Sequence, residues 1–164
     1  MRHVPSVVTV VTMRDDIGIQ GITIGSFVSL SLDPPLVCLN IQKSIGIHDR
    51  IIKASSFAVH VLREDQSALS DWFARSDMGI NDQFADLAYE EAPSGVPLLD
   101  DFLVRFVCKR VDVFPGGDHS ILVGEVVEIT EGEMGRPVVY HQRAYHGVGR
   151  HIADHDHEHL DMAD

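Results

Sequence analysis

The sequence predicts a mainly β fold: a small antiparallel barrel of Greek-key type, closed or nearly closed, with two or three short helices. Runs of β-branched and aromatic residues recur at the spacing of hairpins, and only two segments have the periodicity of an amphipathic helix. The chain has 164 residues, of which 45% are hydrophobic, so its size suits one domain with a single core.

The first half of the chain predicts hairpins and one helix. The β-branched runs at 4–13 and 19–24 are separated by a short turn that contains Asp and Gly. The continuous apolar run at 36–42 predicts a strand that is buried on both faces. Isoleucines recur on one face of the segment 45–54, which predicts a helix with Ser44 as its N-cap.

The second half predicts longer strands. Its expected elements, in chain order, are a strand at 57–62, a helix at 65–74, a loop-rich region at 77–95, strands at 102–113 and 121–129, and a closing hairpin at 138–145. Long strands with few helical residues favour a barrel over a layered α/β fold.

The composition argues against several classes of protein. A net charge of −12 disfavours a general nucleic-acid binder, because such proteins neutralise phosphates with basic surfaces. No stretch approaches the roughly 20 apolar residues of a membrane-spanning helix, and the start of the chain lacks a signal-peptide core. Cys38 and Cys108 lie in apolar runs without zinc-site spacing, which predicts reduced core residues in a cytoplasmic protein.

The most informative segment is 23–37, where small and hydroxyl residues follow an apolar run and end at a double proline. Small residues let a ligand lie against the backbone, and exposed amides with Ser hydroxyls can hydrogen-bond a flat heteroaromatic ring. Taken alone, the segment is equally consistent with a Ser-rich surface loop.

Two further features bear on function. His119 follows a Gly-Gly turn and precedes an apolar run, which places it at a barrel rim as a candidate functional residue, whereas the other histidines of the body, such as His60, are expected to be structural. The basic segment that contains Lys43 and Arg50 either gives a phosphorylated ligand a local positive field or forms a solvated helix face.

Together these segments resemble the short flavin reductase family, the FMN-binding split-barrel reductases that supply reduced flavin to two-component monooxygenases. The motifs that carry the resemblance are VTVVT at 8–12, GIT at 21–23, SF at 26–27, LDPPLV at 32–37, FAVHVL at 57–62, GDH at 117–119, VGEV at 123–126 and PVVYH at 137–141. We therefore expect a reductase-like domain over residues 1–149. The acidic, His-rich tail at 150–164 is expected to be disordered and solvated, with loose metal coordination as the alternative and no defined metal site.

The resemblance implies an NAD(P)H:flavin oxidoreductase that reduces FMN, or FAD, with NADH or NADPH. It also implies a homodimer with the flavin near the subunit interface and a flavin-dependent monooxygenase as partner. The implied positions are His119 where the nicotinamide approaches, Thr23, Ile24, Gly25 and Ser26 along the isoalloxazine ring, Cys38, Leu39, Asn40, Lys43 and Ser44 along the ribityl chain and phosphate, Tyr145 at the border of the site, and Ser29, Ser31, His48 and Phe84 as further cofactor contacts.

The chain departs from the family pattern beside the expected phosphate. The family often has Ser-Arg-Thr where this chain has Ile45, Gly46 and Ile47, so a cation and a hydroxyl are missing, and Lys43, His48 or Arg50 are the candidates to compensate. Two alternatives stay open at this point: a flavin- or haem-binding split barrel that acts as a carrier or sensor, and a reductase of another acceptor such as ferric chelates.

Overall fold

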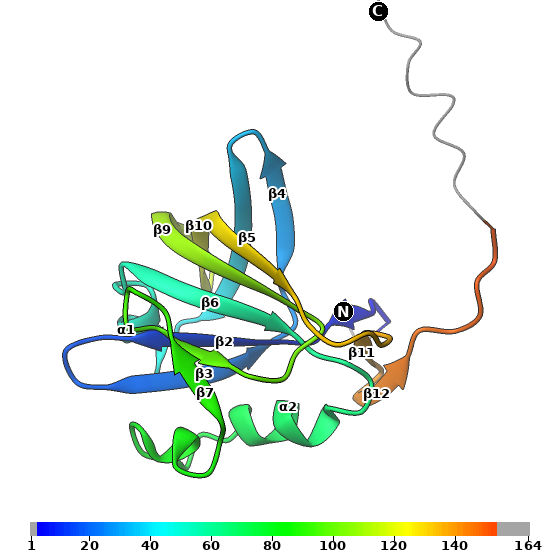
Figure 1. The fold of residues 1–164 in the computed structure, drawn as a ribbon. Helices are drawn as coiled ribbons and strands as arrows, with labels where there is room; N and C mark the ends of the chain where they lie inside the picture. Colours follow the sequence, from blue (N-terminus) through cyan, green and yellow to red (C-terminus); the bar gives the residue numbers. More distant parts are fainter. Residues whose placement is uncertain (1–2, 154–164) are drawn as a thin grey trace, which may run out of the picture.

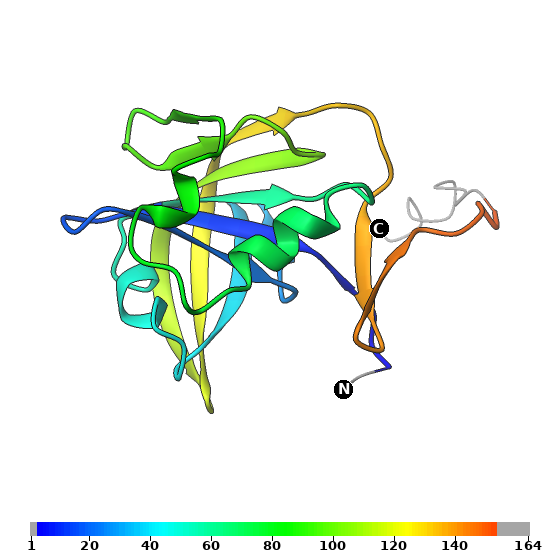
Figure 2. The same cartoon turned by 90° about the horizontal axis from the view of Figure 1, so that it is seen from below.

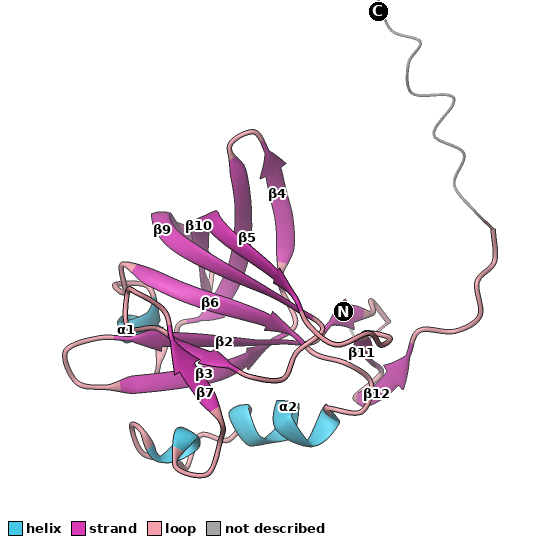
Figure 3. Ribbon diagram, viewed as in Figure 1, coloured by secondary structure: helices cyan, strands magenta, loops and turns pink. Residues whose placement is uncertain are grey.

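The fold was obtained as a computed structural model, which describes residues 3–153. Strands dominate it and the helices are short (Figure 3). The strands are β1 (Ser6–Val7), β2 (Thr9–Arg14), β3 (Ile19–Ile24), β4 (Val28–Leu32), β5 (Pro35–Gln42), β6 (Ser56–Val61), β7 (Tyr89–Glu91), β8 (Pro97–Leu99), β9 (Val104–Gly116), β10 (His119–Glu131), β11 (Val138–His141) and β12 (Ala144–Gly147). The helices are α1 (His48–Ile51), α2 (Ser67–Phe73) and a single 3-10 turn at Asp82–Phe84.

Seven strands form one antiparallel sheet in the order β3-β2-β6-β9-β10-β5-β4. The sheet curls so that β3, at one end, comes into contact with β5 near the other end (Figure 1). A small sheet of β1, β11 and β12 and a β7–β8 pair complete the described strands. The mainly β antiparallel fold with few short helices is therefore confirmed.

The curled sheet encloses the main core, which α1 closes at one end. Phe57, Leu39 and Leu122 are fully buried there, and Ile51 of α1 packs against them. A second apolar cluster lies between β2, β3 and α2, where Phe73 of α2 is buried (Figure 2). The protein thus has a curled sheet around one core, with α2 packed on its outer face.

Several strand boundaries differ from the expectation. The predicted strand at 4–13 is interrupted at Val8, because the main-chain N–H of Val8 bonds to Val138 of β11 and draws β1 into the small sheet. The strand at 36–42 is not buried on both faces: its residues alternate between buried and exposed, because β4 and β5 project beyond the barrel (Figure 1). The hydroxyl-rich stretch is neither a turn nor a loop throughout, since 28–32 form the edge strand β4.

Both predicted helices are shorter than expected. The segment 45–54 forms a helix only at His48–Ile51, and its N-cap is Ile47, so the assignment of Ser44 as the cap was wrong. The helix at 65–74 is confirmed as α2 with shorter bounds, Ser67–Phe73. The long hairpin extends further than predicted, because β9 and β10 pair up to a tight turn at Gly117 and Asp118.

Within residues 3–153, no helix has the length and apolar character needed to cross a membrane. The expectation of a disordered, solvated tail falls mainly on residues 154–164, which lie outside the described part of the chain.

Candidate functional site

A cavity of about 800 Å³ opens where the connection after β3, the end of β5 and the start of β10 meet. Its walls are apolar at Ile22, Ile45 and Ile121, and polar at Asn40 and His119. An apolar slot with a few polar groups at its edge is the usual form of a site for a flat organic ligand.

Ser26 fixes the connection between β3 and β4 at one wall of this cavity. Its hydroxyl donates to the main-chain carbonyl of Asn40 at 3.1 Å and accepts from the main-chain N–H of Asn40 at 3.0 Å. The side chain of Ser26 therefore holds two strands together, rather than standing unengaged toward a ligand.

The main chain beside Ser26 is more accessible to a ligand than its side chain. Gly25 lines the cavity, and among the hydrogen bonds between described residues none is donated by the main-chain N–H of Gly25 or Ser26. A Cβ atom added at Gly25 would lie 2.8 Å from Oγ of Ser6, so a larger residue there would have to displace the Ser6 side chain. Unengaged amides on a close-packed wall suit the acceptor atoms of a heteroaromatic ring.

His119 is the first residue of β10 and lines the same cavity as the β3–β4 connection. Its Nδ1 lies 2.7 Å from Oδ1 of Asp118, and the hydrogen bond is the main cause that holds the pKa of the Asp118 carboxyl below its ordinary value. Nε2 of His119 has no hydrogen-bond partner among residues 3–153, so this nitrogen is available to a ligand.

A second cavity, of about 540 Å³, adjoins the first and shares four lining residues with it, among them Thr23 and Gly25. Thr23 donates its hydroxyl to the main-chain carbonyl of Ser70 in α2 at 2.6 Å. Tyr145 of β12 lines this second cavity, and burial is the main cause that raises the pKa of its hydroxyl. Tyr145 is thus placed at the border of the main cavity.

The structure brings six of the sequence-predicted positions to the main cavity. These are Thr23, Ile24, Gly25, Ser26, Asn40 and His119. Eight others line neither of these two cavities: Ser29, Ser31, Cys38, Leu39, Lys43, Ser44, His48 and Phe84. Leu39 is fully buried in the barrel core, and Phe84 packs against Phe73 under α2.

The predicted phosphate positions do not line the main cavity, although Gln42 and Ile45 beside them do, and their side chains are engaged with the protein. Nζ of Lys43 donates to the carbonyl of Gly117 at 2.5 Å, and the Ser44 hydroxyl accepts from the Gln42 amide at 2.9 Å. The buried His48 ring lies 2.8 Å from Oδ1 of Asp49 and 3.0 Å from Oγ of Ser120. Arg50 forms an ion pair with Asp15, so the basic segment is not one positively charged face.

Sequence analysis missed two residues that line the main cavity from distant elements. Ser6 of β1 and Ala74 at the end of α2 carry no motif of their own. Only the folding of β1 and α2 against β3 brings them to the site. Gly116, which belongs to the Gly-Gly turn before His119, also lines the cavity, and a Cβ atom there would lie 3.1 Å from Ile121.

Comparison with known proteins identifies the class to which this fold and cavity belong. The family model described as the flavin reductase like domain matches residues 1–149. The chain is 41% identical to the FMN reductase (NADH) SmoA of Agrobacterium fabrum over 138 residues, which cover 84% of this chain and 76% of that protein. It is 38% identical over 140 residues to the reductase component of the 4-nitrophenol 4-monooxygenase/4-nitrocatechol 2-monooxygenase of Rhodococcus opacus, covering 85% and 73%.

Solved structures agree with this assignment. The NADH:FAD oxidoreductase SgcE6 of Streptomyces globisporus, in complex with NAD and FAD fragments, superposes with a TM-score of 0.80 at 31% identity, covering 92% of this chain and 87% of that one. The flavin reductase HpaC in complex with NADP+ gives a TM-score of 0.80 at 33% identity, covering 90% and 93%.

The chain therefore belongs to the flavin reductase-like family. It is an NAD(P)H-dependent flavin reductase with the mainly β fold of that family, as the resemblance in its motifs implied. The carrier or sensor alternative without reductase activity is set aside by this membership.

Proposed function

We propose that the protein transfers a hydride from NADH or NADPH to FMN or FAD and passes the reduced flavin to a separate monooxygenase. The observation that carries the assignment of the site is the 800 Å³ cavity, which is lined both by the β3–β4 connection with its unengaged amides and by His119 of β10. The 4-nitrophenol monooxygenase component of Rhodococcus opacus, with 38% identity, supports the role as one half of a two-component system.

The residues around the cavity fit a flavin. Ile22, Ile45 and Ile121 offer apolar surface to the faces of the isoalloxazine ring, and Asn40 offers a polar group to its edge or to the ribityl chain. The amides of Gly25 and Ser26 are fixed dipoles, so they need no reorganisation when negative charge develops at an acceptor edge.

The protein residues bind and orient while the cofactor supplies the reactive atoms. When bound, the flavin accepts a hydride at N5 from the reduced nicotinamide. Asp118 holds the His119 ring through Nδ1, so Nε2 keeps a fixed direction and can position the nicotinamide amide or a phosphate. Proton delivery by His119 is not required, because hydride transfer itself needs no acid at this position.

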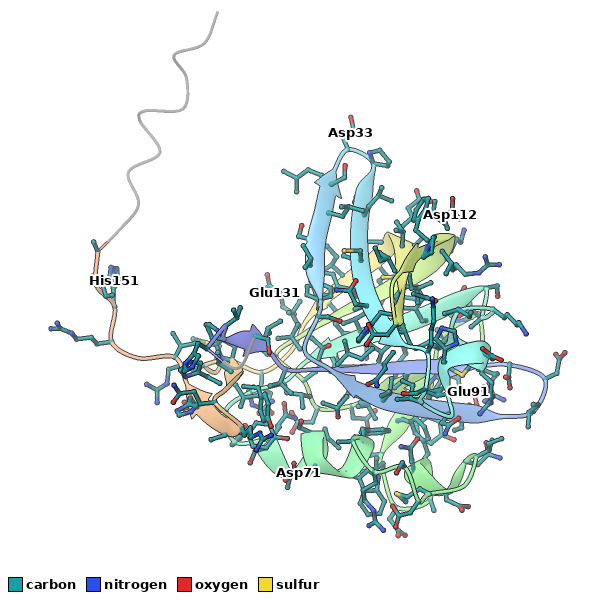
Figure 4. All side chains as sticks on the ribbon, turned by 180° about the vertical axis from the view of Figure 1, so that it is seen from behind. Asp33, Asp71, Glu91, Asp112, Glu131 and His151 are labelled. Carbon is teal, nitrogen blue, oxygen red and sulfur yellow. The ribbon has the colours of Figure 1, made fainter. Side chains whose placement is uncertain are left out.

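We also propose that two copies of the chain associate through the arm formed by β4 and β5. Val28, Leu30 and Leu32 recur at every second position of β4 and are exposed, with Leu32 at 90%. The arm projects beyond the barrel, with Asp33 at its tip (Figure 4). A β-bulge between Ser29 and Ser31 divides these apolar residues between the two faces of the arm. Several exposed apolar residues on one projecting edge strand are typical of an interface between subunits. A Leu30→Asp, Leu32→Asp variant is expected to sediment as a monomer if the unaltered protein is a dimer.

The proposed reaction is tested by mixing the purified protein with FMN or FAD and NADH or NADPH under anaerobic conditions. Loss of the flavin absorbance in the visible range is the expected result. If neither flavin is bleached with either nicotinamide, the proposal is wrong. If a flavin that copurifies is reduced but passes electrons only to ferric chelates, the monooxygenase partner is wrong while the reductase chemistry stands.

A further inference from the structure

The turn that carries His119 is open to solvent. Gly117 and Asp118 form the tip of the β9–β10 hairpin and are exposed, and a Cβ atom added at Gly117 would meet no atom within 4 Å. The ladder between β10 and β5 ends at the pair of His119 and Gln42, so strand pairing supports the turn only at its base. Packing alone therefore does not fix the place of His119 beside the main cavity.

Polar bonds from the connection between β5 and α1 hold this turn. The main-chain N–H of Lys43 donates to the carbonyl of Asp118 at 2.9 Å, and Nζ of Lys43 donates to the carbonyl of Gly117 at 2.5 Å. The pKa of the Asp118 carboxyl is lowered mainly by its hydrogen bond with His119 and, as the smallest cause, by the charge of Lys43. Lys43 thus binds the turn with its main chain and with its ammonium group.

His48 of α1 binds the other side of the same turn. Its Nε2 lies 3.0 Å from Oγ of Ser120, the residue after His119, and its Nδ1 lies 2.8 Å from Oδ1 of Asp49. Because a carboxylate only accepts hydrogen bonds, Nδ1 carries the proton of the neutral ring and Nε2 accepts from the Ser120 hydroxyl. His48 and Ser120 are both buried, so water does not compete for this bond.

The order Ser120, His48 and Asp49 is also that of a hydrolytic triad, but the structure does not favour that function. Ser120 is buried and lines neither of the two cavities, so its hydroxyl has no access to a substrate there. Ile47 and Ile51 anchor α1 in the main core. The bond between His48 and Ser120 therefore connects an anchored helix to the base of an exposed turn.

We propose, on the basis of the function proposed above, that Lys43 and His48 are positioning residues of the reductase. Together they hold the segment Gly117–Ser120 against the anchored β5–α1 connection, and this fixes His119 beside the flavin cavity. Lys43 therefore acts on the hydride transfer through His119, and not by binding the flavin phosphate.

The test removes each bond in the unaltered protein and again in a His119→Ala background. Lys43→Met removes the charge but keeps most of the side chain, and Ser120→Ala removes the hydroxyl that binds His48. Each is expected to lower kcat for NADH oxidation about fivefold, equally with FMN and with riboflavin, which lacks the phosphate. In the His119→Ala background neither change should lower kcat further, because the residue through which both act is gone.

Two further variants separate positioning from other effects of Lys43. Lys43→Arg can still donate to the Gly117 carbonyl and is expected to recover most of the rate. Lys53→Met is the matched control for loss of charge: Lys53 is exposed, its side chain has no hydrogen-bond partner among residues 3–153, and it lines neither cavity, so kcat should stay the same. Fluorescence titration should show that Lys43→Met changes the Kd for FMN less than twofold.

Three results would overturn the proposal. They are an unchanged kcat in Lys43→Met or Ser120→Ala, a loss of kcat that is as large in the His119→Ala background, and a rise in Kd for FMN without one for riboflavin, which would make Lys43 a phosphate ligand. If the unaltered protein reduces no flavin, the proposed function fails first, and hydrogen–deuterium exchange then tests the positioning role alone. Faster exchange of residues 116–121 in Lys43→Met than in Lys53→Met supports that role, and equal exchange overturns it.

Discussion

At the scale of single residues, His119 is the side chain on which the proposed reaction depends most. Asp118 fixes one ring nitrogen, and the other nitrogen has no hydrogen-bond partner in residues 3–153. We expect His119→Ala to lower kcat for NADH oxidation by about tenfold or more, because a positioning contact to the nicotinamide is lost. Stopped-flow absorbance measures the rate, and flavin fluorescence quenching measures the flavin affinity, which should change less than twofold.

The matched control is His141→Ala, which removes a histidine of β11 that lines neither cavity. It should leave both quantities unchanged. An equal loss of flavin affinity and of rate in His119→Ala would instead place His119 within the flavin site.

Gly46 offers a gain-of-binding test at the position where the family often has a cation. A Cβ atom added there would meet no atom within 4 Å, and Gly46 lies in a small cavity next to Ile45 of the main site. We expect Gly46→Arg to lower the Kd for FMN about threefold or more at low salt, because a cation is added beside the phosphate. Fluorescence titration gives the Kd. Riboflavin, which lacks the phosphate, and the Gly46→Ala variant should show no gain.

At the scale of elements, a partly buried ion pair anchors α1 to the hairpin of β2 and β3. The Arg50 guanidinium donates to both carboxylate oxygens of Asp15 at 2.6 Å and also to the carbonyl of Gly18 at 3.0 Å. These bonds lower the pKa of Asp15 to about 2, and the hydrogen bond from Arg50 is the largest cause. The depressed pKa means that this stabilisation is present above the unfolded value of 3.8 and is lost as the pH falls toward 2.

We expect Arg50→Ala to lower the free energy of unfolding by about 2 to 3 kcal/mol, because it leaves a half-buried carboxylate without its partner. Arg75→Ala is the matched control: its ion pair with Asp77 is exposed and screened by solvent, so its loss should lower the stability much less. Urea unfolding at pH 7 measures both. Equal effects of the two substitutions would contradict the anchoring role.

The elements also show which parts of the fold the sequence could predict. The hairpin strand at 19–24 and the closing hairpin were correctly located because each is a local pattern bounded by turn residues. The burial of residues 36–42 on both faces was not predicted correctly. An apolar run shows that the residues are apolar but not what covers them, and Leu36 lies on an arm that projects from the barrel. Ser44 failed as a cap because a turn, rather than a helix, follows it.

At the scale of the whole molecule, the cavity residues also divide into those that a local sequence motif predicts and those that only the fold brings together. Positions on contiguous segments, such as Thr23 to Ser26, were found from the sequence because their motif is local. Ser6 and Ala74 were not found from the sequence, because they reach the cavity only after β1 joins the small sheet and α2 packs across β3. Whether Ser29 and Ser31 contact a flavin depends on the proposed second subunit, since within one chain they lie on the arm and not in the cavity.

His60 couples the stability of the whole barrel to pH. It is fully buried in β6, where its ring lies 3.2 Å from the carbonyl oxygen of Val10 and accepts from the main-chain N–H of Leu99 at 3.1 Å. It therefore joins β2 and β8, the structural role that the sequence predicted. Burial is the main cause that lowers its pKa to about 3.

Because the folded pKa is depressed, the unfolded chain binds a proton at His60 below about pH 6.5 while the folded protein does not. Stability therefore falls as the pH drops from about 6.5 toward 3, and between pH 7 and pH 5 this one group removes about 2 kcal/mol. The His60→Gln variant is expected to be less stable than the unaltered protein at pH 7, but its free energy of unfolding lacks the pH dependence that His60 causes. The difference in free energy of unfolding between the two proteins should therefore be about 2 kcal/mol smaller at pH 5. Urea unfolding at the two pH values measures this difference in the free energy of unfolding. A gap that is the same at both pH values would mean that His60 takes up a proton in the folded protein, and that β6 is open to water on the timescale of the measurement.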